Sequence, residues 1–250
     1  MNDRYIRSIK MPEFPSYDTY LSILPAVRSL FSAEELELHD KVTFFVGENG
    51  TGKSTLLEAV AVKFGFNPEG GTLNFAFSTF DTHSELHKFI KLVKGIERPS
   101  DGFFLRAESF YNAASYIEEL DGIPAPSPKI IESYGGKSLH EQSHGESFFS
   151  LVMNRFSGRG LYILDEPEAA LSPSRQMSLL IRINELVKND SQFIIATHSP
   201  ILLGYPDAAI YELSENGIIR TSYEETETYS VTKAFLDNPK RMMKYLFDEK

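Results

Sequence analysis

The sequence predicts an α/β domain with a mainly parallel sheet at its core, an antiparallel β part at the N-terminus and a small helical lobe. Three short apolar runs, at 42–46, 161–164 and 193–196, consist mostly of residues that favour strands. Buried parallel strands have such uninterrupted apolar runs. Helical patterns at 53–64 and 173–188 follow the first two runs, and this alternation of strand and helix predicts the parallel sheet.

The remaining segments complete the order of elements in a single domain over residues 1–250. Residues 5–11 and 35–38 are the expected antiparallel strands near the N-terminus. Further strands are expected over 72–79, 103–106, 209–213 and 218–221, the last two joined by a turn at Asn216-Gly217. Further helices are expected over 112–120, 145–156 and 231–250, with a break near Pro239. Segment 83–94 fits a helix or a strand equally well, and we expect the inserted helical lobe to span about 80–157.

Composition and charge exclude several classes of function. The net charge of −10 argues against a protein that coats nucleic acid, although a local basic patch or contact through a partner stays open. The chain has no cysteine, which excludes disulfides and thiolate metal sites and favours a reducing compartment. No run approaches the roughly 20 apolar residues of a membrane span, and the N-terminus has no apolar signal core. We therefore expect a cytoplasmic protein with no part inserted in a membrane.

Residues Gly47 to Ser54 form the strongest motif, a complete G-x-x-x-x-G-K-[ST] sequence. Its glycines permit a backbone path in which N–H groups converge on phosphate oxygens, and the positive end of the following helix points to the same place. We expect Lys53 to reach the β- and γ-phosphates of ATP, and Ser54 to ligate Mg²⁺. The residues expected to hold the nucleotide here are Gly47, Asn49, Gly50, Thr51, Gly52, Lys53, Ser54 and Thr55.

Polar residues follow the two later apolar runs. Asp165 and Glu166 come directly after 161–164, where Asp165 is placed to hold the metal and Glu166 to polarise the attacking water. His198 follows 193–196, at the carboxyl end of a strand where open α/β sheets build their sites, and is placed to hydrogen-bond the γ-phosphate. A structural role is the alternative for His198. We expect Lys53, Glu166 and His198 to be the catalytic residues.

A weaker motif, Ser143-His144-Gly145-Glu146-Ser147, stands just before the helical pattern at 145–156. A small residue, a glycine and a helix N-terminus together offer a second surface that binds anions. Alone, the motif fits a simple capped helix start equally well. The motif stands between the phosphate-binding loop (P-loop) at Gly47 to Ser54 and the strand that ends at Asp165. This position favours nucleotide contact through Ser143, Gly145 and Glu146.

In this order the motifs resemble those of the ATP-binding-cassette (ABC) class of P-loop ATPases. The segment from Ser143 to Glu146 resembles the signature motif, usually Leu-Ser-Gly-Gly-Gln, but departs from it at His144. The stretch from Asp165 to Ser172 resembles the Asp-Glu-Pro and D-loop region, and Thr197 to Pro200 is similar to the switch region of soluble members. Those members are the structural-maintenance-of-chromosomes, recombination-repair and overcoming-lysogenization-defect ATPases. Without a coiled-coil arm, the chain resembles a small stand-alone ATPase of the AAA_21 type.

The resemblance implies a soluble Mg²⁺-dependent ATP hydrolase that works as a dimer. Two protomers would sandwich two ATP molecules head to tail, each γ-phosphate lying between one P-loop and the other protomer's Ser143 and Gly145. ATP would join the dimer and hydrolysis would release it, so that the switch acts on a nuclease or other effector in DNA maintenance or phage defence. The resemblance also implies a basic residue near the nucleotide, here Arg28, and a Q-loop residue, for which Glu108 and Ser109 are the candidates and a surface position is the alternative. Glu108 is also a candidate metal ligand.

Two other functions stay open at this point. The chain could be the ATPase subunit of an ABC transporter, although Thr197 to Pro200 and the atypical signature make that less favoured. It could also be a small-molecule kinase, which shares the P-loop but has no need for the signature or for His198 at these spacings. Concentration-dependent turnover would separate any two-protomer site from a kinase.

Overall fold

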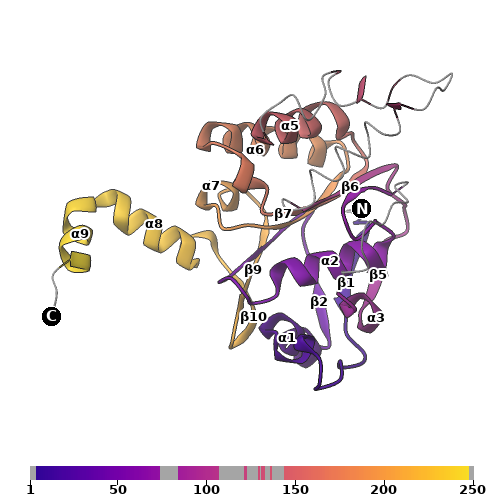
Figure 1. Ribbon diagram of the computed structural model, residues 1–250, viewed down its shortest axis with the longest axis horizontal. Coiled ribbons are helices and arrows are strands. Elements are labelled where there is room, and N and C mark those ends of the chain that lie inside the picture. Colours follow the sequence, from indigo (N-terminus) through magenta and orange to yellow (C-terminus); the bar gives the residue numbers. More distant parts are fainter. Residues whose placement is uncertain are drawn as a thin grey trace.

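The computed structural model describes residues 4–73, 84–106, 121–122, 129, 131–132, 136 and 144–247, and Figure 1 shows their arrangement. A seven-stranded sheet runs through the body in the order β10-β9-β3-β8-β7-β6-β4. Its five parallel strands are β3 (Val42–Val46), β6 (Asp101–Arg106), β7 (Gly160–Asp165), β8 (Gln192–Ala196) and β9 (Ala209–Ser214). Antiparallel strands β10 (Gly217–Thr221) and β4 (Gly71–Thr72) stand at its two ends. The predicted mainly parallel core is confirmed.

A second sheet, antiparallel and three-stranded, covers one side of the body. It has the order β2-β1-β5, with β1 (Ile6–Lys10) between β2 (Glu35–Glu37) and β5 (Lys91–Lys94). The predicted antiparallel part is therefore confirmed. β5 also resolves the segment that fitted a helix or a strand, since a short helix α3 (Leu86–Phe89) comes first and a strand follows. Pairing with β1, far away in the sequence, decides that outcome.

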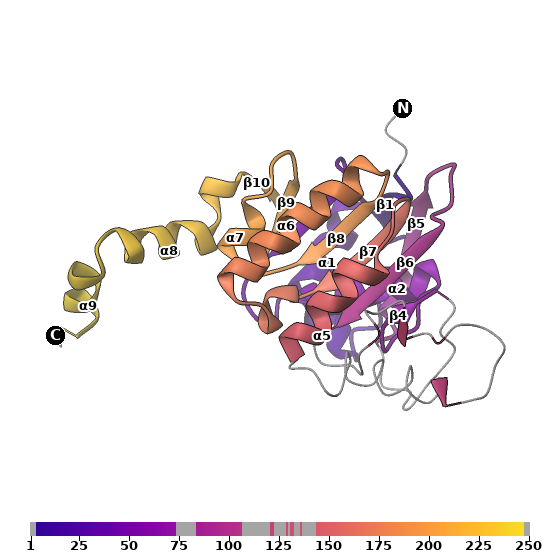
Figure 2. The same ribbon diagram turned by 90° about the horizontal axis from the view of Figure 1, so that it is seen from above.

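Helices cover both faces of the large sheet (Figure 2). The parallel strands are mostly buried, and alternate residues of each strand point to opposite faces of the sheet. Thus Phe45 of β3 joins a core with α1 (Pro25–Ala33) and α2 (Lys53–Phe64), while its neighbour Phe44 joins a core with α5 (His144–Ser150) and α6 (Pro173–Lys188). This sandwich holds the carboxyl ends of the strands in fixed positions.

The helix boundaries follow local sequence signals in several places. α2 and α6 span the ranges predicted for them. Ser172 caps α6 by accepting a hydrogen bond from the Arg175 backbone N–H at 3.4 Å, and Pro173 occupies its first turn. The helix predicted over 145–156 begins as α5 and continues as a π-helical segment, Leu151–Arg155. Shorter helices are Tyr20–Ile23, Pro167–Ala170, α7 (Pro200–Leu203) and Tyr223–Glu225.

Two predictions are corrected or left open at the hairpin and the lobe. The hairpin of β9 and β10 exists, but its two-residue turn is Glu215-Asn216, because Gly217 already pairs with Ser214. Gly217 has φ of +131°, so the glycine serves the first paired position and not the turn itself. The strand end 74–79, the helix 112–120 and much of the inserted lobe at 80–157 lie outside the described residues, and the lobe stays a prediction.

The C-terminal residues form two helices that extend away from the body (Figures 1 and 2). They are α8 (Glu227–Asp237) and α9 (Pro239–Phe247), separated at Asn238. The predicted break near Pro239 is therefore confirmed, because proline is tolerated in the first turn of a helix but not in its interior. α8 begins four residues earlier than predicted, where Thr226 caps it by accepting from the Tyr229 N–H.

Candidate nucleotide-binding site

The P-loop connects β3 to α2 at the carboxyl end of the central strands. Gly47, Gly50 and Gly52 all have positive φ, between 84° and 137°, which favours glycine. A Cβ on Gly47 would lie 2.1 Å from the Leu213 carbonyl oxygen, so β9 packs against the loop too closely for any side chain. Gly52 precedes α2 without a side-chain cap, which leaves the first N–H groups of the helix available to an anion.

Lys53 is the first residue of α2 and is almost completely buried. Its ammonium donates to the carbonyl oxygens of Gly47 and Glu48, at 2.7 and 2.9 Å. Burial lowers its pKa, while the carboxylates of Glu166, Asp165 and Glu168 act in the opposite direction. The lysine is thus folded back on its own loop, with three carboxylates nearby and both of its contacts replaceable by phosphate oxygens.

Ser54 and Asp165 meet although they are distant in sequence. The Ser54 hydroxyl donates to Oδ1 of Asp165 at 3.0 Å, which joins the start of α2 to the end of β7. Burial raises the pKa of Asp165 to about 6, against the lowering effect of the Ser54 hydrogen bond. Within the described ranges, no group of three or more His, Asp or Glu could hold a metal. A hydroxyl and one carboxylate fit Mg²⁺, which takes few protein ligands and completes its shell with waters and phosphate oxygens.

Glu166 and His198 face each other at the ends of β7 and β8. Oε1 of Glu166 lies 3.6 Å from Nε2 of His198, a nitrogen that is buried and has no hydrogen-bond partner among the described residues. Glu166 adopts a left-handed conformation (φ 49°, ψ 53°), and its N–H donates to the Ala196 carbonyl at 2.9 Å. That unusual backbone directs the side chain of a non-glycine residue, which is typical of strained functional positions.

Glu168 is a residue of this site that sequence reasoning missed. Its Oε1 accepts the His198 backbone N–H at 2.5 Å, and it is one of the three carboxylates that act on Lys53. Its Oε2 is buried without a hydrogen-bond partner among the described residues. The spacing Glu166-Pro167-Glu168 was visible, but only the meeting of two strand ends places Glu168 under His198.

Arg106 and Glu58 form a second pair that the motifs did not indicate. Arg106 ends β6 directly beside Asp165 in the strand register, and its guanidinium lowers the pKa of that carboxyl. The same guanidinium makes an ion pair with Glu58 on α2, and Glu58 also accepts the Ser84 N–H at 2.6 Å. The signal that could have found Arg106 is its place at the carboxyl end of a parallel strand next to the acidic one.

The described part of the signature packs on its own chain. A Cβ on Gly145 would lie 2.2 Å from the Ala170 carbonyl oxygen, so glycine lets α5 approach the segment after Glu166. Glu146 lies 3.8 Å from Nη2 of Arg175 on α6. Among the described residues, neither Gly145 nor Glu146 lines the two cavities that Gly47 and Glu48 border. Ser143 lies outside the described residues.

The remaining candidate residues differ in how close they lie to the cavity beside the P-loop. Asn49, Gly50 and Thr51 border a cavity of about 520 Å³ beside the β9–β10 turn, and Thr55 is half-buried on α2. Arg28 lies on α1, whose start reaches the P-loop through the Ala26 N–H and the Thr51 carbonyl at 2.9 Å. The Arg28 side chain is exposed and donates to the Ser22 carbonyl at 2.7 Å. Glu108 lies outside the described residues.

Two protein-family models match separate parts of the chain. Residues 24–108, which include the P-loop, match the AAA_23 model, described as "AAA domain". Residues 138–204, which include the signature, Asp165 and His198, match the AAA_21 model, described as "AAA domain, putative AbiEii toxin, Type IV TA system". Each model covers less than half of the chain, and together they contain all four motifs.

Individual proteins that are similar to the chain include one curated relative and two solved structures. A Haemophilus influenzae protein named "Uncharacterized ABC transporter ATP-binding protein" is 25% identical over 183 residues, 68% of this chain and 67% of the relative. The "SMC head domain from Thermotoga maritima" has 16% identity and a TM-score of 0.42, over 88% of this chain and 99% of that one. A nucleotide-free ATP-binding cassette from an ABC transporter has 17% identity and a TM-score of 0.49, over 96% and 99%.

A complete P-loop, an acidic strand end and a histidine strand end meet at one edge of a mainly parallel sheet. Together with the two family models, this arrangement supports an ABC-class P-loop ATPase. No helix within the described ranges combines the length and the apolar character that a membrane span requires.

Proposed function

We propose that this chain binds and hydrolyses Mg-ATP as a head-to-tail dimer, and that the dimer is an ATP-dependent switch acting on a partner protein. The observation that carries the proposal is the convergence of Lys53, Asp165, Glu166 and His198 at the end of the P-loop strand. These groups supply the cation, the metal ligand, the base and the phosphate donor that phosphoryl transfer to water needs.

The chemistry divides among these residues. Glu166 would take a proton from water, whose oxygen forms a bond to the γ-phosphorus while the bond to the β–γ bridging oxygen breaks and ADP leaves with the electron pair. Lys53 would exchange its contacts with Gly47 and Glu48 for phosphate oxygens. His198, whose backbone N–H donates to Glu168, would donate a side-chain hydrogen bond to the γ-phosphate. Mg²⁺, when held by Ser54 and Asp165, neutralises charge on the phosphates.

The position of the signature supports a two-protomer site. Gly145 packs on Ala170 of its own chain, and within the described residues it does not border the P-loop cavities. A signature that contacts ATP would then belong to the opposite protomer, with Ser143, Gly145 and Glu146 facing the γ-phosphate across the dimer. Arg28 and Glu108 remain proposed contacts to nucleotide and metal.

The first test is light scattering of Glu166→Gln with and without Mg-ATP. The variant keeps the shape of the side chain but cannot accept the proton, so we expect turnover to fall at least about a hundredfold and an ATP-bound dimer to accumulate. Lys53→Ala is the matched control, and it is expected to lose ATP binding and the dimer together. If Glu166→Gln stays monomeric with Mg-ATP at micromolar concentration, the two-protomer mechanism is wrong.

We propose DNA maintenance or phage defence as the biological setting of the switch. The similarity to soluble members of the class supports a role in DNA maintenance or phage defence, with a nuclease or other effector as partner and a cytoplasmic location. The AAA_21 description, which names a toxin of a type IV toxin–antitoxin system, favours defence. A gene for a nuclease beside this one would support this setting.

A transporter subunit is the second candidate function. The name of the Haemophilus influenzae relative favours it, since that protein is called an ABC transporter ATP-binding protein. In that case, the chain should co-purify with a membrane protein, and its ATPase rate should rise when the membrane subunit is added. A neighbouring gene that encodes several membrane spans would support this reading over the soluble switch.

A further inference from the structure

The C-terminal helices α8 and α9, residues 227–247, form an arm that extends outside the body (Figures 1 and 2). Neither helix has a buried residue. Large apolar side chains on the arm face solvent, with Leu236, Leu246 and Phe247 exposed by 68%, 67% and 74%. Helices of 11 and 9 residues are marginal in water without tertiary packing. Something outside the described body should therefore cover this arm.

α9 has two distinct faces. At 100° per residue, Met242, Met243, Leu246 and Phe247 fall on one side of the helix, and Lys240, Arg241 and Lys244 fall on the other. The three cations are not balanced by any acid between 239 and 247. A helix with one apolar and one basic face fits a partner surface that has apolar side chains next to carboxylates.

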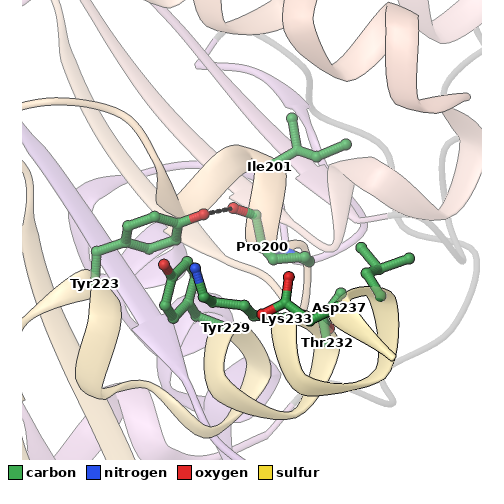
Figure 3. Close-up of a pocket in the computed structure, with 8 residues that line it drawn as sticks. Pro200, Ile201, Tyr223, Tyr229, Thr232, Lys233 and Asp237 are labelled. Carbon is green, nitrogen blue, oxygen red and sulfur yellow. Dashed lines mark hydrogen bonds between the residues drawn. The ribbon is translucent and has the colours of Figure 1, made fainter. Parts of the chain in front are cut away.

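The root of the arm, at the start of α8, contacts the body. The Tyr223 hydroxyl donates to the Pro200 carbonyl at 2.8 Å, and the Tyr223 and Tyr229 rings lie 4.5 Å apart. α7 and α8 border a cavity of about 350 Å³ here, and Lys233 lies over the Tyr229 ring. Figure 3 shows the side chains that line this cavity. The hydrogen bond and the ring contact fix the start of α8, the cavity continues along α8 as far as Asp237, and α9 projects beyond it (Figure 1).

The root of the arm lies beside the P-loop, on the face of the body that carries the candidate nucleotide site. Glu227, Thr228, Val231 and Thr232 of α8 border a cavity of about 230 Å³ together with Gly47, Glu48 and His198. The arm therefore begins beside the P-loop and projects from the face on which a second protomer would close. A copy seated on that face would lie within reach of the arm.

We propose that the arm is a docking element for a second copy of this chain, with α9 packed on the body of that copy. The proposal rests on the dimer of the proposed function for the place where the copies meet. Charge complementarity favours this occupant, because a helix with three cations meets a chain of net charge −10. Carboxylates of Glu48, Glu212, Glu215 and Glu227 border the P-loop cavities on the closing face. An anionic membrane would attract α9 too, but it would repel the acidic body.

A cross-linking experiment tests the contact directly. The chain has no cysteine, so Leu246→Cys places one benzophenone maleimide on the apolar face of α9. An equal mixture of ¹⁵N-labelled and unlabelled protein is irradiated with and without Mg-ATP. We expect cross-linked peptides that join residue 246 of one isotope to residues 4–222 of the other. The control, Ile96→Cys, is also highly exposed but stands between β5 and β6, and it should give few such peptides. Cross-links confined to one isotope, or none, would overturn the proposal.

A second pair of variants measures how much the apolar face of α9 contributes to the affinity of the dimer. In the Glu166→Gln background with Mg-ATP, Leu246→Glu/Phe247→Glu should raise the dimer dissociation constant about tenfold or more by sedimentation velocity, and Ile96→Glu should leave it unchanged. Binding of the parent protein to phosphatidylglycerol vesicles that the double variant loses, with self-association unaffected, would replace the second copy by a membrane.

Failure of the arm and failure of the switch give different results. Mixed-isotope cross-links from residue 246 in a Glu166→Gln protein that ATP does not dimerise would keep the arm and reject the ATP switch. An ATP-dependent dimer without those cross-links would keep the switch and reject the arm.

Discussion

The helix after the P-loop and the helices of the C-terminal arm have similar lengths and opposite surroundings. α2 has 12 residues, and seven of them are buried between the two sheets. α8 and α9 have 11 and 9 residues, and none is buried. The body thus fixes α2 and its lysine from every side, whereas only the root of the arm is fixed. Packing on all of its neighbours lets α2 hold Lys53 in place at the nucleotide site, whereas the exposed α8 and α9 offer a surface to a partner.

The contrast is sharpest in stability. Leu57→Ala should lower the free energy of unfolding by about 2–5 kcal/mol, because Leu57 is fully buried on α2 and its removal leaves a cavity. Leu246→Ala, the same substitution on α9, should change it by less than about 0.5 kcal/mol in the monomer. Urea denaturation of dilute protein measures both. Equal losses would mean that the arm folds onto its own body.

Changes on α2 and on the arm should also differ in their effect on ATP affinity. Lys53→Ala removes the buried cation of the P-loop, and we expect ATP affinity to fall at least about a hundredfold. Ending the chain at Asn238 removes α9 and should leave the affinity of the monomer unchanged. Isothermal titration with Mg-ATP measures both variants. A large loss in the truncated chain would show that α9 shapes the site and contradict its role as a free arm.

Two glycines of the P-loop test how tightly the body encloses the site. Gly47→Ala should destabilise the nucleotide-free protein by about 1–3 kcal/mol, because its Cβ would collide with the Leu213 carbonyl in addition to the strain of φ at +137°. Gly50→Ala has no neighbour within 4 Å and meets only the strain of φ at +84°, so it should cost about 1 kcal/mol. Thermal denaturation compares them, and an equal cost would mean that β9 moves away freely.

Asp165 should give a small effect on stability that depends on pH. Burial raises the pKa of its carboxyl to about 6, so in the folded protein the charged form is disfavoured, and stability is lost as pH rises through 6. Asp165→Asn should therefore raise the unfolding free energy of the nucleotide-free protein by about 1–2 kcal/mol at pH 7.5, with the gain vanishing near pH 4. Urea denaturation at both pH values tests this.

The control for that experiment is an aspartate with the opposite shift. Lys41 lowers the pKa of the exposed Asp190, so that carboxylate stabilises the protein at neutral pH and loses its effect as pH falls. Asp190→Asn should therefore show no gain at pH 7.5. A gain of equal size at both pH values in Asp165→Asn would mean that charge burial is not its cause.

The P-loop, the order of the motifs and the elements with local signals could be predicted from the sequence alone. β3, α2 and α6 could be placed because apolar runs, glycines and a capped proline mark their ends. The carboxyl ends of parallel strands meet at one edge, so the approach of Asp165 and His198 to the P-loop also followed from pattern. Residues 107–120 and most of 123–143 lie outside this comparison.

The contacts that depend on strand register between distant segments could be found only in the folded chain. Glu168 accepts a hydrogen bond from the His198 N–H, and Arg106 pairs with Glu58 next to Asp165. Both contacts form because the register brings the ends of neighbouring strands side by side. The fate of segment 83–94 depended on pairing with β1, and the hairpin turn moved by one residue when Gly217 paired with Ser214. Local patterns cannot encode these outcomes, because register is a property of two segments and a one-residue shift exchanges the faces of a strand.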